Sequence, residues 1–268
     1  MQRQRMLSFA AIRVVVFSDI DGTMTAPGFS LEETLRTLAD CTAAGVGIVP
    51  VTSKTYAELT DWWHHPGILP CGVYETGFGI AVHARAPWHS VIARTVPRHG
   101  YTCRSTLGDW TVFEHTVPYT PEILRLELQA RGVIVRFLRE IPLDEFVRLS
   151  GLSTEAARRA YQRRGPEPFQ IIRGSPDTVD VYARERGASF SMGKLLGIIA
   201  TYHKGTAVRA LVDAWRHVRP DIPFYAVGDA PSDTYMAVEG VTFHRVRDPE
   251  EWNTWMRALL RDRRSTVH

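Results

Sequence analysis

Cysteine is scarce in this sequence, and its three copies lack the spacing of a disulfide framework or a metal site. Cys41, Cys71 and Cys103 are spread along 268 residues without a Cys-x-x-Cys pair. Disulfide-rich secreted domains and zinc modules need several cysteines at short spacing. We therefore exclude both classes and predict reduced thiols in a cytoplasmic protein.

Long apolar runs and a charge imbalance are also missing. No segment approaches the roughly 20 apolar residues that a membrane-spanning helix needs, so we expect no membrane partner. The net charge is +3 and the basic residues are scattered, which argues against a nucleic-acid partner. The chain starts with basic and then apolar residues, as a signal peptide does. However, Arg13 interrupts the apolar run, and cleavage would remove the motif that follows it.

The stretch VVVFSDIDGTMT (residues 14–25) carries the strongest signal for function. Its apolar start predicts a buried parallel strand, and ligands bind beyond the carboxyl ends of such strands. There, Asp19 can attack phosphorus, and Asp21 can move a proton to the leaving oxygen. Gly22 permits a sharp turn, and Thr23 can offer a hydroxyl and an N–H group to phosphate. The alternative is an ordinary Asp-Gly turn without catalytic function.

A helix and two further strands follow. Residues 30–44 have apolar side chains at helical spacing, and residues 46–51 predict a second buried strand. This strand–helix–strand unit brings Thr52 and Ser53 to the same sheet edge, where their hydroxyls can bind a phosphoryl oxygen. Alternatively, they cap the next helix. Residues 72–82 predict another strand with glycine kinks, in which Glu75 either faces the site or is a satisfied polar residue at a strand end.

From about residue 89 the sequence changes character, and the regular alternation of helix and strand is lost. Residues 121–131 predict a helix, and LDEFVRLSGLSTEAARRAYQRR predicts two helices joined at Gly151. PEPFQIIRG and TVDVYARERGASFSMGKL predict strands of an antiparallel sheet. Residues 89–197 are thus a predicted α+β insertion with the size of an independent domain.

The parallel pattern resumes at Lys204, which opens a predicted helix. A lysine ammonium suits a phosphate or an aspartyl-phosphate, although a solvated lysine is the alternative. Residues 223–227 predict a short strand that delivers Asp229 and Asp233 to the same sheet edge. Clustered carboxylate oxygens suit Mg²⁺, which also bridges to phosphate. We predict a Mg²⁺ site supplied by Asp19, Asp21 and Asp229.

Four strand or helix ends thus carry, in order, Asp-x-Asp, Thr/Ser, Lys and Asp-x₃-Asp. This order resembles the four motifs of the haloacid dehalogenase-like (HAD) superfamily of phosphohydrolases, and the insertion resembles its α/β cap of class IIB. A closer resemblance links most of the chain to the mannosyl-3-phosphoglycerate phosphatase family. It rests on the segments VTSKTYAEL, GLSTEAARRAYQRRGPEPF, HKGTAVRAL and GDAPSD.

The resemblance implies a Rossmann-like α/β core, with a parallel sheet and helices on both faces, from residues 1–88 and 198–268. Residues 89–197 would form the cap that reads the substrate. Asp19 would be the nucleophile, Asp21 the acid and base, and Lys204 the catalytic cation. Phosphate contacts are expected from Gly22, Thr23, Thr52, Ser53, Lys204 and Ser232. Mg²⁺ is expected at Asp19, Asp21, Asp229 and Asp233.

In the expected cap, Arg163 and Glu167 match the family's Arg-x₃-Glu-Pro-Phe, and the expected substrate contacts are Arg163, Glu167, Arg186 and Ser189. Ser189 stands where the family has an arginine for an acidic substrate group. Either a less acidic leaving group is preferred, or another arginine replaces the missing charge; the candidates are Arg173, Arg184 and Arg186. Two family asparagines are also replaced, by Thr76 and Ser232.

The sequence therefore predicts a Mg²⁺-dependent phosphatase that acts on a small phosphorylated sugar or glycosyl-glycerate through an aspartyl-phosphate. The alternatives are a phosphotransferase or phosphomutase on the same core, in which a second substrate replaces water, and a binding protein without catalysis. The intact Asp19, Asp21, Lys204 and Asp229 argue against the last. The oligomeric state is not indicated.

Overall fold

A parallel four-stranded sheet forms the centre of the molecule in the computed structural model, which describes residues 11–117, 119–193 and 195–265. All three pairings in this sheet are parallel, and every residue of β1 and β2 is buried. Strands with apolar side chains on both faces need cover on both faces. The order is β12 (Val241–Arg245), β11 (Phe224–Gly228), β1 (Val14–Ser18) and β2 (Val46–Pro50).

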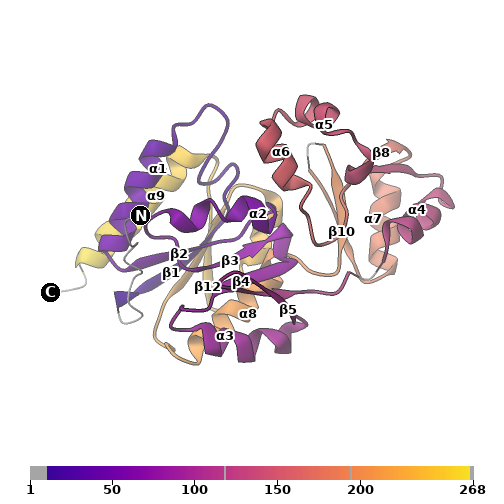
Figure 1. Ribbon diagram of the computed structural model, residues 1–268. Coiled ribbons are helices and arrows are strands. Elements are labelled where there is room, and N and C mark those ends of the chain that lie inside the picture. The colour runs from indigo at the N-terminus through magenta and orange to yellow at the C-terminus, as the bar shows by residue number, and fades with distance from the viewer. Residues whose placement is uncertain (1–10, 118, 194, 266–268) are drawn as a thin grey trace.

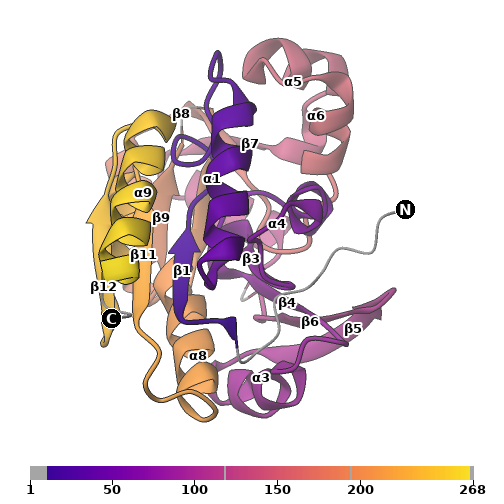
Figure 2. The same ribbon diagram turned by 90° about the vertical axis from the view of Figure 1, so that its left-hand side faces the viewer.

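Helices provide this cover, as Figures 1 and 2 show. α1 (Leu31–Ala43) and α9 (Pro249–Ser265) pack on one face, and α3 (His89–Thr95) and α8 (Lys204–Arg216) pack on the other. Side chains alternate along β1, so Val14 and Val16 join the cluster of the first face and Val15 and Phe17 that of the second. The predicted α/β core with a parallel sheet and helices on both faces is confirmed.

A second, antiparallel sheet continues the core beside β2. A parallel bridge between Val51 and Val73 joins the two sheets. Residues 72–82, predicted as one kinked strand, are two strands separated by the 3₁₀ turn η3 (Glu75–Gly77). The order of this sheet is β3 (Cys71–Tyr74), β4 (Gly79–His83), β6 (Trp110–Glu114) and β5 (Thr102–Leu107).

The insertion begins and ends later than predicted. α3 packs against α8, and β6 pairs with β4, so residues 89–117 belong to the core. At the other end, β10 (Gly197–Ala200) pairs with β9 (Ser189–Met192) in the sheet of the insertion. The loss of regular alternation at residue 89 therefore marks the change from parallel to antiparallel pairing. We call residues 119–200 the inserted lobe.

The inserted lobe is an antiparallel sheet with helices and a cluster of buried apolar side chains of its own. Figure 1 shows it beside the core, joined to it through two chain segments. Its strand order is β7 (Ile134–Phe137), β8 (Phe169–Arg173), β10 and β9. Its helices are α4 (Pro121–Gln129), α5 (Leu143–Ser150), α6 (Thr154–Ala160) and α7 (Pro176–Glu185).

The segment TVDVYARE, predicted as a strand, is helical in α7. The Ser175 side chain accepts a hydrogen bond from Asp177 N, and Pro176 occupies the first turn, where its missing N–H group has no cost. Val179, Tyr182 and Ala183 are buried, which is the spacing of one helix face. The capping signal thus prevails over the β-branched and aromatic side chains that favour a strand.

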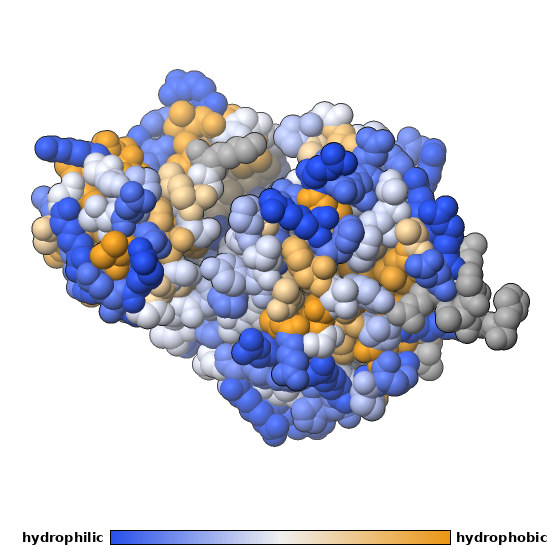
Figure 3. Space-filling view, turned by 180° about the vertical axis from the view of Figure 1, so that it is seen from behind, coloured by the Kyte–Doolittle hydropathy of each residue, from blue (hydrophilic) through white to orange (hydrophobic). Residues whose placement is uncertain are grey.

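Short elements complete the fold, and the surface is mixed in character. The molecule is hollowed between the inserted lobe and the core, and hydrophilic side chains cover much of both (Figure 3).

Over the three described ranges, no helix has both the length and the apolar character needed to cross a bilayer. The short elements are α2 (Tyr56–Leu59), η2 (Trp62–His64), η4 (Val96–His99), η5 (Leu138–Glu140) and η6 (Pro231–Met236).

Candidate active site

Asp19, Lys204 and Asp233 meet at the carboxyl edge of the central sheet. Asp19 directly follows β1, Lys204 is the first residue of α8, and Asp233 lies in η6 after β11. The Lys204 ammonium donates hydrogen bonds to Asp19 Oδ1 and Asp233 Oδ1, both at 2.6 Å. All three side chains are buried. The structure thus brings together three of the four motifs that the sequence places at strand and helix ends.

The acidity of this cluster follows from its burial. Burial raises the pKa of Asp19 to about 6; Lys204 opposes the shift, and Asp233 adds to it. Burial also acts to lower the pKa of Lys204, but the two carboxylates outweigh it, so the pKa is raised and the ammonium stays charged. Asp19 is therefore a carboxylate in dry surroundings beside a fixed cation, which suits a nucleophile toward phosphorus.

Asp229 lies beside this cluster and is held by the Asp-Gly-Thr turn of the first motif. The Thr23 hydroxyl donates to Asp229 Oδ1 at 2.7 Å. At Gly22 a Cβ atom would lie 2.4 Å from Asp229 Oδ2, so only glycine permits this approach. The backbone N–H groups of Gly22 and Thr23 bond to Thr25 O and Ile20 O within the turn. These donors are thus already bonded within the protein, and the phosphate contacts of Gly22 and Thr23 stay a prediction.

Three carboxylates form a site that fits a hard cation. Asp19, Asp229 and Asp233 each offer one oxygen, and these oxygens lie within 4.8 Å of one another. Lys204 compensates one of the three negative charges, which leaves an excess that a divalent cation matches. Carboxylate oxygens at this spacing suit Mg²⁺, and the bond from Thr23 orients one of the ligands.

Asp21 faces the cavity but stands outside this group of carboxylates. Its side chain is 51% exposed and pairs with Lys54 Nζ at 2.9 Å. The role of the Asp21 carboxylate as a metal ligand stays a prediction, since Asp21 is not one of the three grouped carboxylates. Lys54 is a site residue that the motifs did not predict, although a cation directly after Thr52 and Ser53 is a visible signal.

The hydroxyl groups of the second and fourth motifs are divided between the cavity and the interior. Ser53 and Ser232 line the cavity. Thr52 is completely buried, and its Oγ1 accepts a hydrogen bond from Lys54 N at 3.1 Å. The contact of these three hydroxyls with phosphate stays a prediction.

A cavity of about 780 Å³ lies between the core and the inserted lobe, above the carboxylates. The core contributes Asp19, Asp21 and Lys204 to its wall. The β9–β10 hairpin of the lobe forms the opposite wall. The cavity is also lined by neutral and apolar side chains that the motifs did not predict. Examples are Phe190, Met192, Ile198, Tyr202, His203 and Tyr235.

Two of the four predicted lobe residues, Arg163 and Ser189, line this cavity. Arg163 Nη1 also donates to Ser53 O of the core at 3.3 Å. Glu167 does not line the cavity: it accepts a hydrogen bond from Arg139 N at 2.9 Å and pairs with the Arg139 guanidinium at 3.0 Å. Its predicted substrate contact is corrected to a bond within the lobe.

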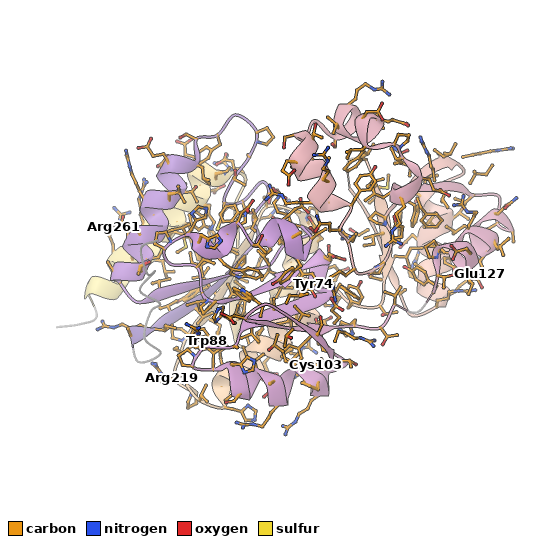
Figure 4. The ribbon with its side chains drawn as sticks, viewed as in Figure 1. Tyr74, Trp88, Cys103, Glu127, Arg219 and Arg261 are labelled. Carbon is orange, nitrogen blue, oxygen red and sulfur yellow. The ribbon has the colours of Figure 1, made fainter. Side chains whose placement is uncertain are left out.

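The arginines proposed to replace the missing charge point elsewhere. Arg186 pairs with Glu127 at 2.5 Å, and Figure 4 shows Glu127 on the outer part of the lobe, far from the core. Arg184 pairs with Asp180 one helical turn earlier at 2.8 Å. Arg173 is exposed at the end of β8. The predicted substrate contact of Arg186 is therefore wrong, because α7 turns this side chain toward solvent.

Glu75, for which the sequence left two roles open, lies behind Arg163. Its side chain is completely buried, and its φ of +50° is uncommon for a residue other than glycine. The carboxylate accepts hydrogen bonds from Arg164 N at 3.0 Å and Gly165 N at 2.7 Å. Burial raises the pKa of Glu75, and Arg163 and these two N–H groups oppose the shift. Glu75 therefore joins the core to the inserted lobe.

Comparison with solved structures identifies the architecture. A protein from Thermoplasma acidophilum aligns with a TM-score of 0.61 and 14% identity, over 92% of this chain and 98% of that chain. A phosphatase of the haloalkanoate (HAD) enzyme superfamily from Bacteroides thetaiotaomicron aligns with a TM-score of 0.56 and 14% identity, over 94% and 95%. The chain has the HAD-like fold. A HAD-like hydrolase from Bacteroides thetaiotaomicron also has it, with a TM-score of 0.55 and 12% identity over 92% and 99%.

Sequence comparison gives a shorter match for this HAD-like chain. No protein-family model matches it. The mannosyl-3-phosphoglycerate phosphatase of Aeropyrum pernix is 34% identical over 56 residues, which is 21% of this chain and 20% of that protein. The match spans about a fifth of the relative's length. The relative belongs to the family that the motifs of this sequence resemble.

Proposed function

We propose that this protein is a Mg²⁺-dependent phosphomonoesterase that removes phosphate from a phosphorylated sugar or glycosyl-glycerate. The observation that carries the proposal is the Lys204 ammonium, 2.6 Å from both Asp19 and Asp233, with Asp229 beside them below a large cavity. A phosphatase shares the fold, and the short match to a mannosyl-3-phosphoglycerate phosphatase adds support.

Asp19 is the nucleophile in this proposal. Its carboxylate attacks phosphorus in line, the bond from phosphorus to the leaving oxygen breaks, and an aspartyl-phosphate forms. Lys204 offsets negative charge on the transferring phosphoryl group, since such catalysis consists mainly of positioning and electrostatics. Mg²⁺, when bound by Asp19, Asp229 and Asp233, supplies further charge neutralisation.

Asp21 moves the protons. In the first half of the reaction it protonates the leaving oxygen. In the second half its carboxylate accepts a proton from the water that attacks the aspartyl-phosphate, which releases phosphate and restores Asp19. The position of Asp21 on the cavity wall, half exposed and paired with Lys54, suits this exchange.

The cavity supports a sugar-like leaving group. Its volume of about 780 Å³ lies within the usual range of small-molecule sites. Its wall includes the hydroxyl-bearing Ser53, Ser189 and Ser232 and the aromatic Phe190 and Tyr235. Sugar hydroxyls can bond to the former, and the C–H faces of a sugar ring can pack on the latter.

Phosphate release from p-nitrophenyl phosphate tests the proposal. We expect turnover with Mg²⁺, its loss in EDTA, and its return when Mg²⁺ is restored. Asp19→Asn is nearly isosteric but cannot attack phosphorus, so it should lose turnover while its circular dichroism stays unchanged. A panel of sugar phosphates that includes mannosyl-3-phosphoglycerate then ranks the leaving groups. Turnover that survives Asp19→Asn in protein free of deamidation, or no phosphate release from any compound, contradicts the proposal.

A further inference from the structure

We propose that Glu75 neutralises Arg163 and so makes the leaving-group side of the cavity select a neutral leaving group. The inference rests on the phosphatase function proposed above and names the substrate class of that site. It follows from the pairing of one buried carboxylate of the core with one guanidinium of the inserted lobe.

Arg163 is the one arginine among the cavity-lining residues of the described ranges. An unopposed guanidinium at this position would attract an anionic leaving group by charge-assisted hydrogen bonds. Here, however, Arg163 Nε lies 3.6 Å from Glu75 Oε2, and Nη1 bonds to Ser53 O. The Arg163 side chain is only 13% exposed and that of Glu75 is fully buried, so solvent screens their attraction weakly.

Glu75 cannot turn away from this pair. Its carboxylate accepts the N–H groups of Arg164 and Gly165, and its backbone conformation is set by the tight turn between β3 and β4. At Gly165 a Cβ atom would lie 2.8 Å from Glu75 Oε2 and 2.7 Å from the Phe78 ring, so the lobe backbone packs directly on the carboxylate. The carboxyl group opposite Arg163 is therefore held in a fixed position at the contact between lobe and core.

The neighbouring arginine does not share this carboxylate. The Arg164 guanidinium pairs with Glu114, which also accepts a hydrogen bond from the Tyr74 hydroxyl at 2.7 Å. Figure 4 labels Tyr74 in the core. Neither Arg164 nor Glu114 lines the cavity. Among the described residues, the Glu75 side chain therefore pairs with the Arg163 guanidinium alone. Glu114 provides a chemically matched control, because it also joins the core to the lobe through an arginine.

A neutral hydrogen-bonding group completes this part of the cavity. Tyr202 lines it, is 2% exposed, and its hydroxyl has no hydrogen-bond partner among the described residues. This buried hydroxyl adds polarity but no charge. A neutral Arg163–Glu75 pair fits a polyhydroxylated leaving group better than a carboxylate-bearing one.

Two probes separate these classes: sn-glycerol 1-phosphate and 3-phospho-D-glycerate, which share the configuration at C2 and differ in a hydroxymethyl group against a carboxylate. We expect the wild type to favour the glycerol compound, measured as kcat/KM or as the inhibition constant against p-nitrophenyl phosphate. Glu75→Gln should shift the ratio toward the glycerate compound by about tenfold or more. The reason is that Arg163, no longer neutralised, can form a charge-assisted hydrogen bond with the carboxylate of that compound. Glu114→Gln should leave the ratio unchanged, and Glu75→Gln combined with Arg163→Gln should abolish the shift.

Three results overturn the inference: a wild type that favours the glycerate compound, equal losses on both probes in Glu75→Gln, or the same shift in Glu114→Gln. Equal losses would show that Glu75 only holds the lobe in place. Calorimetric binding of both probes to the Asp19→Asn protein, with and without Glu75→Gln, gives the same ratio without turnover. An inactive wild type would therefore contradict the proposed function, while the binding ratio would still decide this inference.

Discussion

The Thr23 hydroxyl donates a hydrogen bond to Asp229 Oδ1 at 2.7 Å, although the two residues are 206 positions apart in the sequence. This bond connects the first and the last motif of the active site. It also explains why a hydroxyl follows Gly22: the glycine lets Asp229 approach, and the threonine then orients it.

Thr23→Val should therefore weaken the metal site without removing a metal ligand. We expect the Mg²⁺ concentration for half-maximal activity to rise about 10–100-fold, which is typical when a ligand loses its orienting partner. Activity at saturating Mg²⁺ should be largely retained. Thr23→Ser keeps the hydroxyl and is the matched control. An unchanged Mg²⁺ requirement in Thr23→Val, measured by titrating EDTA-treated protein, would show that the bond does not orient Asp229.

Gly22→Ala should cost both stability and metal affinity. Gly22 has a φ of +86°, and the new Cβ atom would lie 2.4 Å from Asp229 Oδ2. Gly28→Ala is the control, since its φ is +81° but nothing lies within 4 Å. The control should lose about 1–2 kcal/mol from its positive φ alone. Urea unfolding should show a larger loss for Gly22→Ala, with a raised Mg²⁺ requirement. Equal losses would mean that the contact with Asp229 is relaxed easily.

Asp21→Asn should slow turnover according to the leaving group. Loss of general acid catalysis commonly costs about 10²–10⁴-fold. The loss should be large for sugar phosphates, whose alkoxide leaves poorly, and small for p-nitrophenyl phosphate, whose phenolate needs little protonation. Lys54→Gln removes the partner of Asp21 but keeps the acid, so it should preserve the dependence on leaving group. Similar losses on both substrate types in Asp21→Asn would remove Asp21 from the acid role.

His115 should make the fold sensitive to acid. Its ring lies 4.0 Å from the Tyr101 ring centre and stacks on Tyr202 at 4.9 Å. Burial lowers the pKa of His115 from 6.5 to about 4. The unfolded chain therefore binds the proton first as the pH falls, so the contribution to stability is complete above pH 6.5 and is lost between pH 6.5 and about 4.

Replacement of this ring tests the effect. His115→Phe keeps an aromatic ring but cannot bind a proton. Between pH 7.5 and 5, the wild type should lose about 1–2 kcal/mol more unfolding free energy than His115→Phe, measured by urea titration at both pH values. Equal losses in the two proteins would show that His115 keeps its ordinary acidity in the folded state.

The sequence by itself determined the parallel sheet of the core and which motif side chains meet at its edge. Asp19 and Asp229 follow short apolar runs, and Lys204 opens a helix, which are signals carried by a few adjacent residues. Parallel strands then bring their carboxyl ends to one sheet edge, so the order of motifs along the chain is enough to predict that these side chains meet.

Only the tertiary structure decided which partner each polar side chain takes. Three contacts depend on distances between segments that are far apart in the sequence. They are the hydrogen bond of Thr23 to Asp229, the ion pair of Asp21 with Lys54, and the pairing of Glu75 with Arg163. The outward direction of Arg186 likewise depends on α7 being a helix. The side chains of that segment favour a strand, and the Ser175 cap together with the packing of one face against the lobe decides for the helix.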